Sequence, residues 1–486
     1  MNSATNIFVG RHQQLAELRK ILESDKPEFI AVYGRRRVGK TFLVKEAASN
    51  KFSFYFTASH GVSKIEQLTN FIIQLRKYSG DENIEVPKSW FTAFSLLGKY
   101  LDSLPKNLNK ILFFDELPWA ETPKSGFLGA FENFWNMRCS GNNDIKLVAC
   151  GSATSWIINK VINNRGGLHN RLTHQFLVEP FTLKESKEYF EAYGFRLSEE
   201  KITEIYMILG GIPYYFSLID KGESIARNID RLFFASNAVL KNEFDKLYSA
   251  LFRNPGLHLE VVRELSKKDT GLTRQEIIKK LKITGNGNLS IILKELEECG
   301  FIRSYLPFKK AAAKKTNKTL VKTLYQLIDL YTLFYFRFVE NNEYYDSDYW
   351  TSNYRDPRLN IWRGLAFEKV CLWHVSQIKE ALGISGVSAR ICSWTGEDEN
   401  GEKAQIDLLI DRKDDVVNIC EIKYSLGEYS ITKKYAQELE NKIDIFIRAS
   451  LTKKTPVLTF ITNLGLKENT YSDIAQKSLT AEQLFR

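Results

Sequence analysis

Hydrophobic positions in the first third of the chain form short runs of strand length that alternate with helical spacing. Largely apolar runs cover residues 29–33, 111–114, 146–150 and 175–178. Runs that are apolar on both faces are typical of buried parallel strands, whereas the three-to-four-residue spacing that follows the first run is helical. The pattern therefore predicts an α/β domain built on a parallel sheet.

Residues 257–306 break into three helical patterns. The second opens with Thr273 and, three residues later, Glu276, which together make a capping box. The third covers 289–299, and Gly300 then ends it before a strand begins. This order predicts a winged helix-turn-helix, which binds either DNA or another protein surface. The positions that would enter a DNA groove are Asn286, Asn288 and Ser290.

A helix expected from Asn360 onward carries an acidic residue inside its apolar stripe. The stripe consists of Ile361, Leu365, Leu372 and Val375. Glu368 falls within it, and a buried carboxylate costs several kcal/mol unless it is paired or binds a metal. Glu368 is therefore a candidate functional residue. The aromatic segment 324–339 ahead of it is expected to be a packing helix.

Two strand patterns, 405–410 and 416–424, follow this helix and are joined by a polar turn. Glu421 and Lys423 are two residues apart, so they lie on one face of the second strand. Pairing of the strands as a hairpin would bring Asp407 of the first strand close to both. Each acid taken alone could equally be salt-bridged on its strand.

The strongest motif of the chain follows the first apolar run. It fits GxxxxGK[ST] between a strand and a helix, the context of a phosphate-binding loop. The loop consists of Gly34, Arg35, Arg36, Arg37, Val38, Gly39, Lys40 and Thr41. In such a loop the backbone N–H groups surround a phosphate, Lys40 reaches the β and γ phosphates, and the Thr41 hydroxyl binds Mg²⁺.

Polar residues at the ends of the later strands supply the other groups that ATP hydrolysis needs. Asp115 follows the run 111–114 and is expected to hold Mg²⁺, while Glu116 polarises the attacking water. Ser152, after the run 146–150, either senses the γ phosphate or caps the next helix. Arg171, preferred over Arg165, is expected to meet the nucleotide in cis or from a neighbouring subunit.

These motifs together resemble the archaeal and bacterial ATPase family within the AAA+/STAND nucleoside triphosphatases. The resemblance rests on residues 8–11, the phosphate loop, the Phe-Phe-Asp-Glu strand end, Gly151-Ser152, and Gly-Gly-Ile-Pro-Tyr-Tyr at 210–215. It implies that Gly10 and Arg11 lie near the adenine and that Pro213 belongs to a helical lid over the nucleotide. ATP and Mg²⁺ are the implied cofactors.

The C-terminal acids resemble the PD-(D/E)xK nuclease superfamily, matched by Glu368, Asp407, Glu421 and Lys423. Over its whole length, the chain resembles archaeal-type ATPases that carry a C-terminal DUF234 domain. The nuclease resemblance implies that Asp407 and Glu421 hold Mg²⁺, or Mn²⁺, that Glu368 completes the site, and that Lys423 orients water or neutralises the developing charge.

Charge and composition sharpen the choice of partner. The 486-residue chain has a net charge of +10, and residues 301–325 contain seven basic residues and no acidic one. The six lysines among them, from Lys309 to Lys322, fall where the wing of a winged helix should be. DNA is therefore the expected partner, although a solvated basic surface remains an alternative. No run approaches the roughly 18 apolar residues of a membrane span, and no export signal begins the chain, so we expect a cytoplasmic protein that contacts no membrane.

Together these patterns predict an α/β P-loop NTPase core at 1–178, a helical lid at 179–243, a winged helix at 244–325 and a restriction-endonuclease-like domain at 326–486. The first hypothesis is an ATP-binding and ATP-hydrolysing protein that acts on DNA through a metal-dependent nuclease-like module. The alternative is a STAND-type signalling or remodelling switch that oligomerises or binds a protein partner, with the nuclease-like domain as a non-catalytic platform.

Overall fold

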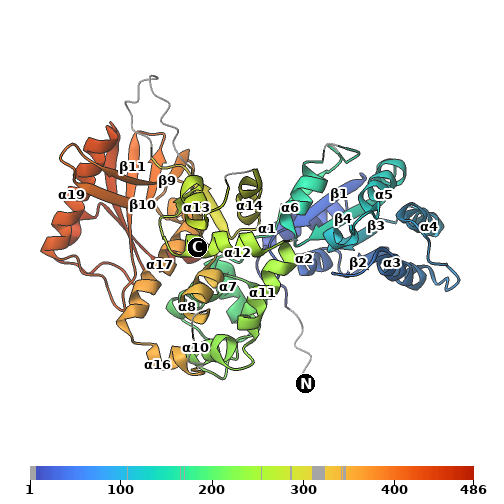
Figure 1. Ribbon diagram of the computed structural model, residues 1–486, viewed down its shortest axis with the longest axis horizontal. Helices are drawn as coiled ribbons and strands as arrows, with labels where there is room; N and C mark the ends of the chain where they lie inside the picture. The colour runs from blue at the N-terminus through green and yellow to red at the C-terminus, as the bar shows by residue number, and fades with distance from the viewer. Residues whose placement is uncertain are drawn as a thin grey trace. The chain divides into compact units, whose positions relative to one another are not determined.

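The computed structural model describes residues 7–486 except 107, 165, 169, 253, 285–286, 309–322, 341 and 343–345. These residues form two compact units (Figure 1). The first unit joins Met1–Pro180 with Ile212–Tyr214 and Asp245–Pro255, and the second holds the remainder. Arg165, Asn286 and the predicted wing lysines from Lys309 to Lys322 lie outside the described residues.

The first unit is built on a five-stranded sheet in the order β2-β3-β4-β1-β5, in which all the paired strands are parallel. The strands are β1 (Glu28–Tyr33), β2 (Phe54–Thr57), β3 (Lys110–Asp115), β4 (Ile145–Gly151) and β5 (His174–Leu177). The predicted parallel α/β core is therefore confirmed. The four apolar runs found in the sequence correspond to β1, β3, β4 and β5.

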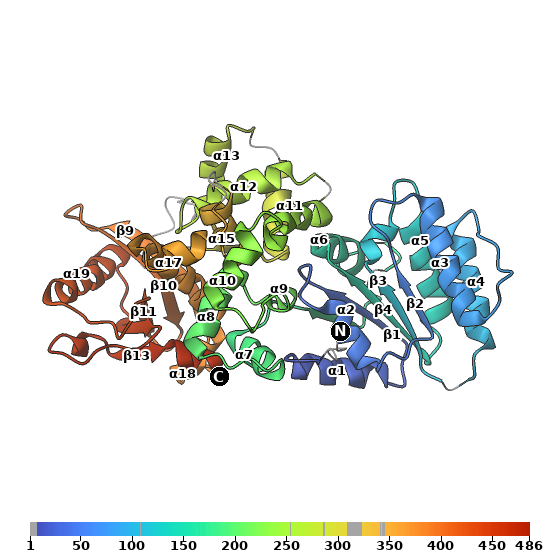
Figure 2. The same cartoon turned by 90° about the horizontal axis from the view of Figure 1, so that it is seen from below.

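Helices cover both faces of this sheet. They are α1 (His12–Leu22), α2 (Lys40–Ala47), α3 (Lys64–Ser79), α4 (Trp90–Ser103), α5 (Phe127–Phe134) and α6 (Thr154–Ile157), with short turns η1 (Leu117–Ala120), η2 (Trp135–Cys139) and η3 (Ile158–Ile162). In Figure 2, α3, α4 and α5 lie together on one side of the strands. Phe29 and Phe114 of the sheet meet Phe131 of α5 there, in a buried aromatic core.

The second unit begins with helices and ends with a mixed sheet. Its helices are α7 (Leu183–Ala192), α8 (Glu199–Leu209), α10 (Ile225–Ile229), α12 (Gly256–Ser266), α13 (Arg274–Leu281), α14 (Gly287–Glu298), α15 (Leu330–Phe334), α16 (Tyr349–Asn353), α17 (Pro357–Trp373), α18 (Val375–Ala381) and α19 (Lys433–Ser450). The helices α9 (Pro213–Phe216) and α11 (Val239–Leu251) each span a boundary between the units, and the short turns are η4 (Asp230–Phe234), η5 (Tyr335–Val339), η6 (Ser472–Ile474) and η7 (Ala481–Phe485).

A buried histidine connects the first of these helices to α17. His374 Nε2 accepts a hydrogen bond from the Leu183 amide (2.9 Å), and its Nδ1 lies 2.8 Å from the Val370 carbonyl oxygen. The ring therefore carries its proton on Nδ1 and is neutral. Burial lowers the pKa of His374 to about 4.

A small three-stranded sheet lies among α12, α13 and α14. Its strands β6 (Leu272–Thr273), β7 (Ile302–Tyr305) and β8 (Leu324–Leu327) pair in the antiparallel order β6-β8-β7. The capping box predicted at the start of the second helix is present, because Thr273 and Glu276 exchange hydrogen bonds at the start of α13. The three helical patterns of the sequence are confirmed as α12, α13 and α14.

The C-terminal sheet has the order β13-β12-β11-β10-β9. Its strands are β9 (Ala389–Glu397), β10 (Lys403–Arg412), β11 (Val416–Lys423), β12 (Thr455–Thr462) and β13 (Lys477–Thr480). The strands β9, β10 and β11 are antiparallel, which confirms the predicted hairpin, whereas β11, β12 and β13 run parallel. The apolar face of α19 packs against this sheet.

Two expectations for the second unit are wrong. The predicted apolar stripe of α17 is not its buried face, since Ile361 is 63% exposed. The helix instead buries Leu359, Trp362, Ala366, Phe367 and Val370, and Glu368 is half-buried at the edge of that face. The segment 324–339 is not a single helix, because its first four residues pair with β7 as β8.

Candidate nucleotide site and C-terminal acidic groups

The phosphate loop connects the end of β1 to the first residue of α2. Two of its glycines have backbone angles that side chains rarely adopt, with φ of 141° at Gly34 and 96° at Gly39. A Cβ on Gly34 would lie 2.2 Å from the carbonyl oxygen of Val178, far inside van der Waals contact. Backbone shape therefore requires glycine at these positions, in addition to the room that a phosphate needs.

Lys40 is buried, and its ammonium group is held by the protein. Its Nζ donates hydrogen bonds to the carbonyl oxygens of Gly34 (3.0 Å) and Arg35 (2.8 Å) and to Ser152 Oγ (3.1 Å). An ammonium has three N–H donors, and these bonds use all of them. A phosphate that binds Lys40 must therefore replace at least one of these acceptors.

Thr41 and Asp115 lie together at the carboxyl ends of the strands. Thr41 Oγ1 donates to Asp115 Oδ2 (3.0 Å), and the Tyr55 hydroxyl donates to the same oxygen (3.4 Å). Burial raises the pKa of Asp115, and the adjacent charge of Glu116 raises it further. A hydroxyl beside a buried carboxylate is a set of hard oxygen ligands, so these residues fit Mg²⁺. With ATP present, Mg²⁺ would neutralise charge on the β and γ phosphates.

Glu116 is held by the end of the neighbouring strand. Its carboxylate accepts hydrogen bonds from the Ser152 amide (3.0 Å) and the Ser152 hydroxyl (2.6 Å). The residue before α6 is Ala153, and its N-cap position shows no side-chain hydrogen bond, so Ser152 does not cap that helix. Ser152 instead joins Glu116 to Lys40, which links the group that would activate water to the group that would bind phosphate.

The remaining predicted nucleotide residues surround this loop. Arg11 ends the turn before α1, where its Nη2 donates to the Glu179 carbonyl oxygen (3.0 Å) and its Nη1 lies close to Gly39. The Arg37 guanidinium lies 3.8 Å from the centre of the Tyr214 ring, next to Pro213. Gly10 directly precedes Arg11, and Arg35, Arg36 and Val38 are the remaining residues of the phosphate loop between Gly34 and Gly39.

Arg171, by contrast, lies in an exposed turn before β5, where its amide donates to the Leu168 carbonyl oxygen (3.1 Å). Its catalytic role stays a prediction.

Sequence reasoning missed Tyr55 and Tyr214 at this site. Tyr55 belongs to β2, which pairs with β3 so that Thr57 lies opposite Asp115. The apolar run 54–56 was a signal for that strand, although nothing in it indicates which neighbour it joins. Tyr214 follows Pro213 in the Gly-Gly-Ile-Pro-Tyr-Tyr motif, so the motif itself could have pointed to it.

In the C-terminal sheet, Glu421 is the centre of a cluster of cations and hydroxyls. Its carboxylate is bonded to Tyr435 Oη (2.5 Å), Lys442 Nζ (2.8 Å) and Lys423 Nζ (2.9 Å). The two lysines hold the pKa of Glu421 at about 2 despite its burial. Lys423 is thus beside Glu421 as predicted, whereas Tyr435 and Lys442 of α19 were missed.

Glu368 of α17 and Asp407 of β10 form a second acidic group. Burial and the charge of Asp407 raise the pKa of Glu368 to about 7. Asp407 accepts a hydrogen bond from Gln405 Nε2 (2.7 Å) and lies where the register of β10 against β9 shifts. A bulge of this kind redirects side chains, so simple alternation along β10 does not place Asp407.

Two cations near this group were also missed. Lys369 is fully buried next to Glu368 on α17, and burial lowers its pKa. Arg303 of β7 lies near enough to Asp407 to feel its charge, and burial lowers the pKa of Arg303 to about 10.

These acids do not form a metal centre as they stand. Across the described parts of the chain, no three His, Cys, Asp or Glu side chains come together as a group that could hold a metal ion. The oxygens of Glu421 are already engaged by two lysines and a tyrosine. The predicted pair Asp407 and Glu421 therefore does not fit Mg²⁺ or Mn²⁺ in this arrangement. No metal-dependent reaction follows from these contacts.

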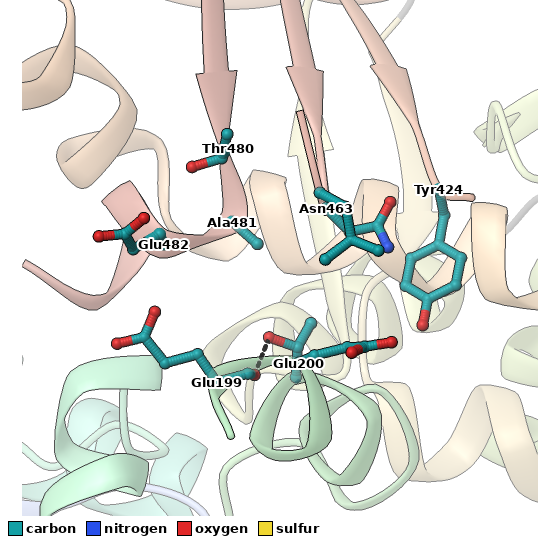
Figure 3. A pocket seen from close by; sticks show the side chains of 9 residues that line it. Glu199, Glu200, Tyr424, Asn463, Thr480, Ala481 and Glu482 are labelled. Atoms are coloured by element: carbon teal, nitrogen blue, oxygen red, sulfur yellow. Dashed lines mark hydrogen bonds between the residues drawn. The ribbon is translucent and has the colours of Figure 1, made fainter. Parts of the chain in front are cut away.

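A separate cavity of about 240 Å³ opens where β11, β12 and β13 end (Figure 3). Its walls include Glu199, Glu200, Glu482, Tyr424 and Asn463. Lys187 pairs with Glu199 at 2.7 Å, and the other acids leave this edge of the sheet negative. Because carboxylates repel phosphates, this edge is poorly suited to DNA.

The phosphate loop and the Thr41–Asp115 pair at the ends of a parallel sheet are the arrangement of a P-loop ATPase. Residues 8–219 match the family model of the ATPase domain found predominantly in Archaea.

An uncharacterized protein of Methanocaldococcus jannaschii is 25% identical over 448 residues, which cover 90% of this chain and 92% of that protein. An uncharacterized ATP-binding protein of the same organism is 44% identical over 45 residues, covering 9% of this chain and 76% of that protein.

Among solved structures, the Walker-type ATPase of Pyrococcus abyssi is 17% identical, with a TM-score of 0.49 over 68% of this chain and 96% of its own. A similarity of this size does not establish a shared function. Among the described helices, none is both long enough and apolar enough to cross a membrane.

Proposed function

We propose that this ATPase acts on DNA and that ATP binding governs its hold on DNA. The observation that carries the proposal is the order α12, β6, α13, α14, β7, β8, with its small antiparallel sheet. This is the element order of a winged helix, in which the third helix enters the major groove. In this chain that helix is α14.

The charge on this domain supports a polyanionic partner. Lys279 and Lys280 of α13, and Lys282 directly after it, have exposed side chains. On α14 the exposed positions include Asn288, Ser290 and Lys294. Acidic residues lie at the C-terminal end of α14, whereas its N-terminal half carries the polar residues Asn288 and Ser290 and no charged one. That half is the part of a recognition helix that reads bases.

The nucleotide site offers a route by which ATP could alter the rest of the molecule. Arg37 of the phosphate loop stacks on Tyr214, and Tyr214 is the last residue of the segment Ile212–Tyr214 that belongs to the first unit. An arginine that turns toward a bound phosphate would leave the tyrosine ring. ATP would then change the contact at the point where the chain leaves the nucleotide-binding unit.

The test is DNA affinity measured as a function of salt. Each lysine–phosphate contact that is removed should reduce the slope of log affinity against log salt by about 1. The double variant Lys279→Ala, Lys294→Ala should therefore lose affinity by a similar factor for every DNA sequence. Its slope of log affinity against log salt should also be shallower than that of the wild type. The exposed Lys184→Ala on α7 is the matched control. Unchanged affinity in the double variant would remove α13 and α14 from the DNA interface.

The C-terminal sheet has a second candidate role, that of a non-catalytic platform in an ATP-gated switch. The observation that favours it is the engagement of Glu421 by Lys442, Lys423 and Tyr435, which leaves the acid little capacity for a metal. The nuclease-like alternative requires that a metal displace these partners from Glu421, which lies in the same compact unit as Glu368 and Asp407.

A plasmid assay separates these two roles. Supercoiled plasmid is incubated with Mg²⁺ or Mn²⁺, with and without ATP, beside Asp407→Ala and Glu421→Ala. Nicking that Asp407→Ala abolishes while its ATP hydrolysis continues would establish a nuclease. DNA binding without nicking in the wild type would establish the platform.

A further inference from the structure

Glu116, the residue expected to activate water, has an unusual backbone. Its φ of 48° and ψ of 41° lie in the left-handed region, which a residue with a side chain keeps only where its surroundings enforce it. Glu116 directly precedes the turn η1, and the amide of Trp119 in that turn donates a hydrogen bond to the Glu116 carbonyl oxygen (2.9 Å). Groups that hold η1 in place therefore also hold the backbone of Glu116.

One side chain that holds η1 is Gln67 of α3, which is fully buried. Its Nε2 donates to the Trp119 carbonyl oxygen (2.9 Å) and to the Ser59 carbonyl oxygen (2.6 Å). Its Oε1 accepts a hydrogen bond from the Ser59 amide (3.2 Å). Both N–H donors and the oxygen of this buried amide group are thus used, and all of them hold backbone atoms.

These hydrogen bonds join two loops that follow neighbouring strands. Ser59 lies just after β2 and Trp119 lies just after β3, and the two strands are paired. The ring of Trp119 also packs edge-on against His60, with the ring centres 5.3 Å apart. Since these loops lie beyond the paired residues of the strands, side chains must fix their positions. Gln67 does so for both loops at once.

The turn η1 is also in close contact with Gly151, the last residue of β4. A Cβ at Gly151 would lie 2.6 Å from Cδ of Pro118 in η1, so the turn packs directly against the strand end. The next residue is Ser152, whose amide and hydroxyl donate to the Glu116 carboxylate. A shift of η1 would therefore move the carboxylate of Glu116 relative to Ser152.

We propose that Gln67 is a positioning residue of the ATPase site. By anchoring the Trp119 carbonyl, it keeps η1 in the conformation that supports the left-handed backbone of Glu116, and so keeps the carboxylate beside Ser152. A general base must lie within hydrogen-bond reach of the attacking water, so a small shift of Glu116 slows hydrolysis without weakening ATP binding. The proposal rests on Glu116 as the group that activates water and is independent of DNA binding.

The test begins with Gln67→Met. Methionine keeps the length of the side chain and has no N–H donor, so η1 loses its anchor while the space stays filled. The kcat for ATP hydrolysis should fall by about ten- to a hundredfold, because a misplacement of about 1 Å can cost that much. The affinity for a fluorescent ATP analogue should stay within about twofold of the wild-type value, since no phosphate contact is removed.

Asn70→Ala is the matched control. Asn70 also lies on α3, and its Nδ2 donates to the Ser59 hydroxyl (3.0 Å) in the same loop. Within the described residues it makes no hydrogen bond to η1. Its kcat should therefore stay within about threefold of the wild-type value.

A double variant separates positioning from a general loss of structure. In Glu116→Gln, the group that Gln67 positions has already lost its basicity. Adding Gln67→Met to Glu116→Gln should therefore leave the rate of single-turnover hydrolysis unchanged, because two residues that act as one unit are not additive. A general loosening of the first unit would instead lower the rate in both backgrounds.

Three results would overturn the proposal: a wild-type kcat in Gln67→Met, an equal loss of kcat in Asn70→Ala, and a full further loss when Gln67→Met is added to Glu116→Gln. A wild-type kcat in Glu116→Gln itself would show that Glu116 is not the base, and the proposal would fall with that assignment. If Gln67→Met does not fold, Gly151→Ala, which pushes on Pro118, decides the question. It must lower kcat in the wild type and leave Glu116→Gln unchanged, and any other outcome would overturn the role of η1.

Discussion

Replacing Glu116 by glutamine tests the assignment of the group that activates water. The substitution keeps the size of the side chain and leaves an oxygen that can accept a hydrogen bond from Ser152, which now donates to the carboxylate at 3.0 and 2.6 Å. The basicity and the negative charge are lost. A positioned general base contributes about 10²–10⁴ in rate, so kcat should fall by that factor, or about 3–5 kcal/mol in activation free energy.

The same substitution should leave nucleotide binding intact. Glu116 and Asp115 are adjacent in the chain, so their like charges repel, and the charge of Glu116 adds to burial in raising the pKa of Asp115. ATP brings further negative charge to this place. Removing one of the two charges should therefore hold the ATP affinity constant or increase it.

The assay measures steady-state phosphate release and, separately, the affinity for a fluorescent ATP analogue. Glu85→Gln, in an exposed loop of the same unit, is the control for loss of a carboxylate. A kcat within about threefold of the wild-type value would refute the assignment, because general-base catalysis is worth far more than that.

Two further predictions concern stability. Gly34→Ala should destabilise the first unit by more than Gly61→Ala, because both glycines have positive φ but only a Cβ at Gly34 would meet another atom, the Val178 carbonyl oxygen at 2.2 Å. Thermal unfolding measures both variants, and Gly61→Ala should lose about 1 kcal/mol. Equal losses in the two variants would contradict the steric argument. The pKa of His374 is about 4 in the folded protein, whereas it is about 6.5 in an unfolded chain, so as the pH falls the unfolded chain is protonated first. The free energy of unfolding should therefore be constant above about pH 6.5 and fall by roughly 3 kcal/mol as the pH drops to 4. Urea unfolding at several pH values measures this slope, which should flatten in His374→Gln; the same slope in both proteins would mean that other groups cause it.

Much of the nucleotide site was predictable because its motifs are local. The phosphate loop occupies eight consecutive residues between a strand and a helix, and the strand that ends in Asp115 is marked by its own apolar run. Parallel strands place their carboxyl ends at one edge, so Thr41 and Asp115 could be expected to meet. Their 3.0 Å contact follows that expectation.

The contacts of Ser152 could not be read in the same way. They join three strand ends, and sequence spacing gives no order for the strands of a sheet. The two alternatives for Ser152 could be separated only once the start of α6 was known.

The C-terminal residues were harder to predict because their positions depend on tertiary packing. Glu421 and Lys423 lie on one strand face as the spacing of two requires, but Lys442 reaches Glu421 from α19, 21 residues away. At Asp407 the bulge in β10 breaks the alternation on which the prediction rested. The stripe on α17 failed because that helix is buried on several sides, so hydrophobic spacing did not reveal which side faces the core.

The most direct test of ATP-governed DNA binding is DNA affinity at one salt concentration in three nucleotide states. The states are no nucleotide, ADP with Mg²⁺, and a non-hydrolysable ATP analogue with Mg²⁺. Coupling between two sites is typically about 5–150-fold in affinity, so the wild type should change by at least about fivefold between states. Lys40→Ala, which lacks the phosphate-binding ammonium, should show one affinity throughout. A wild-type protein that binds DNA equally in all three states, or does not bind DNA at all, would contradict the proposal.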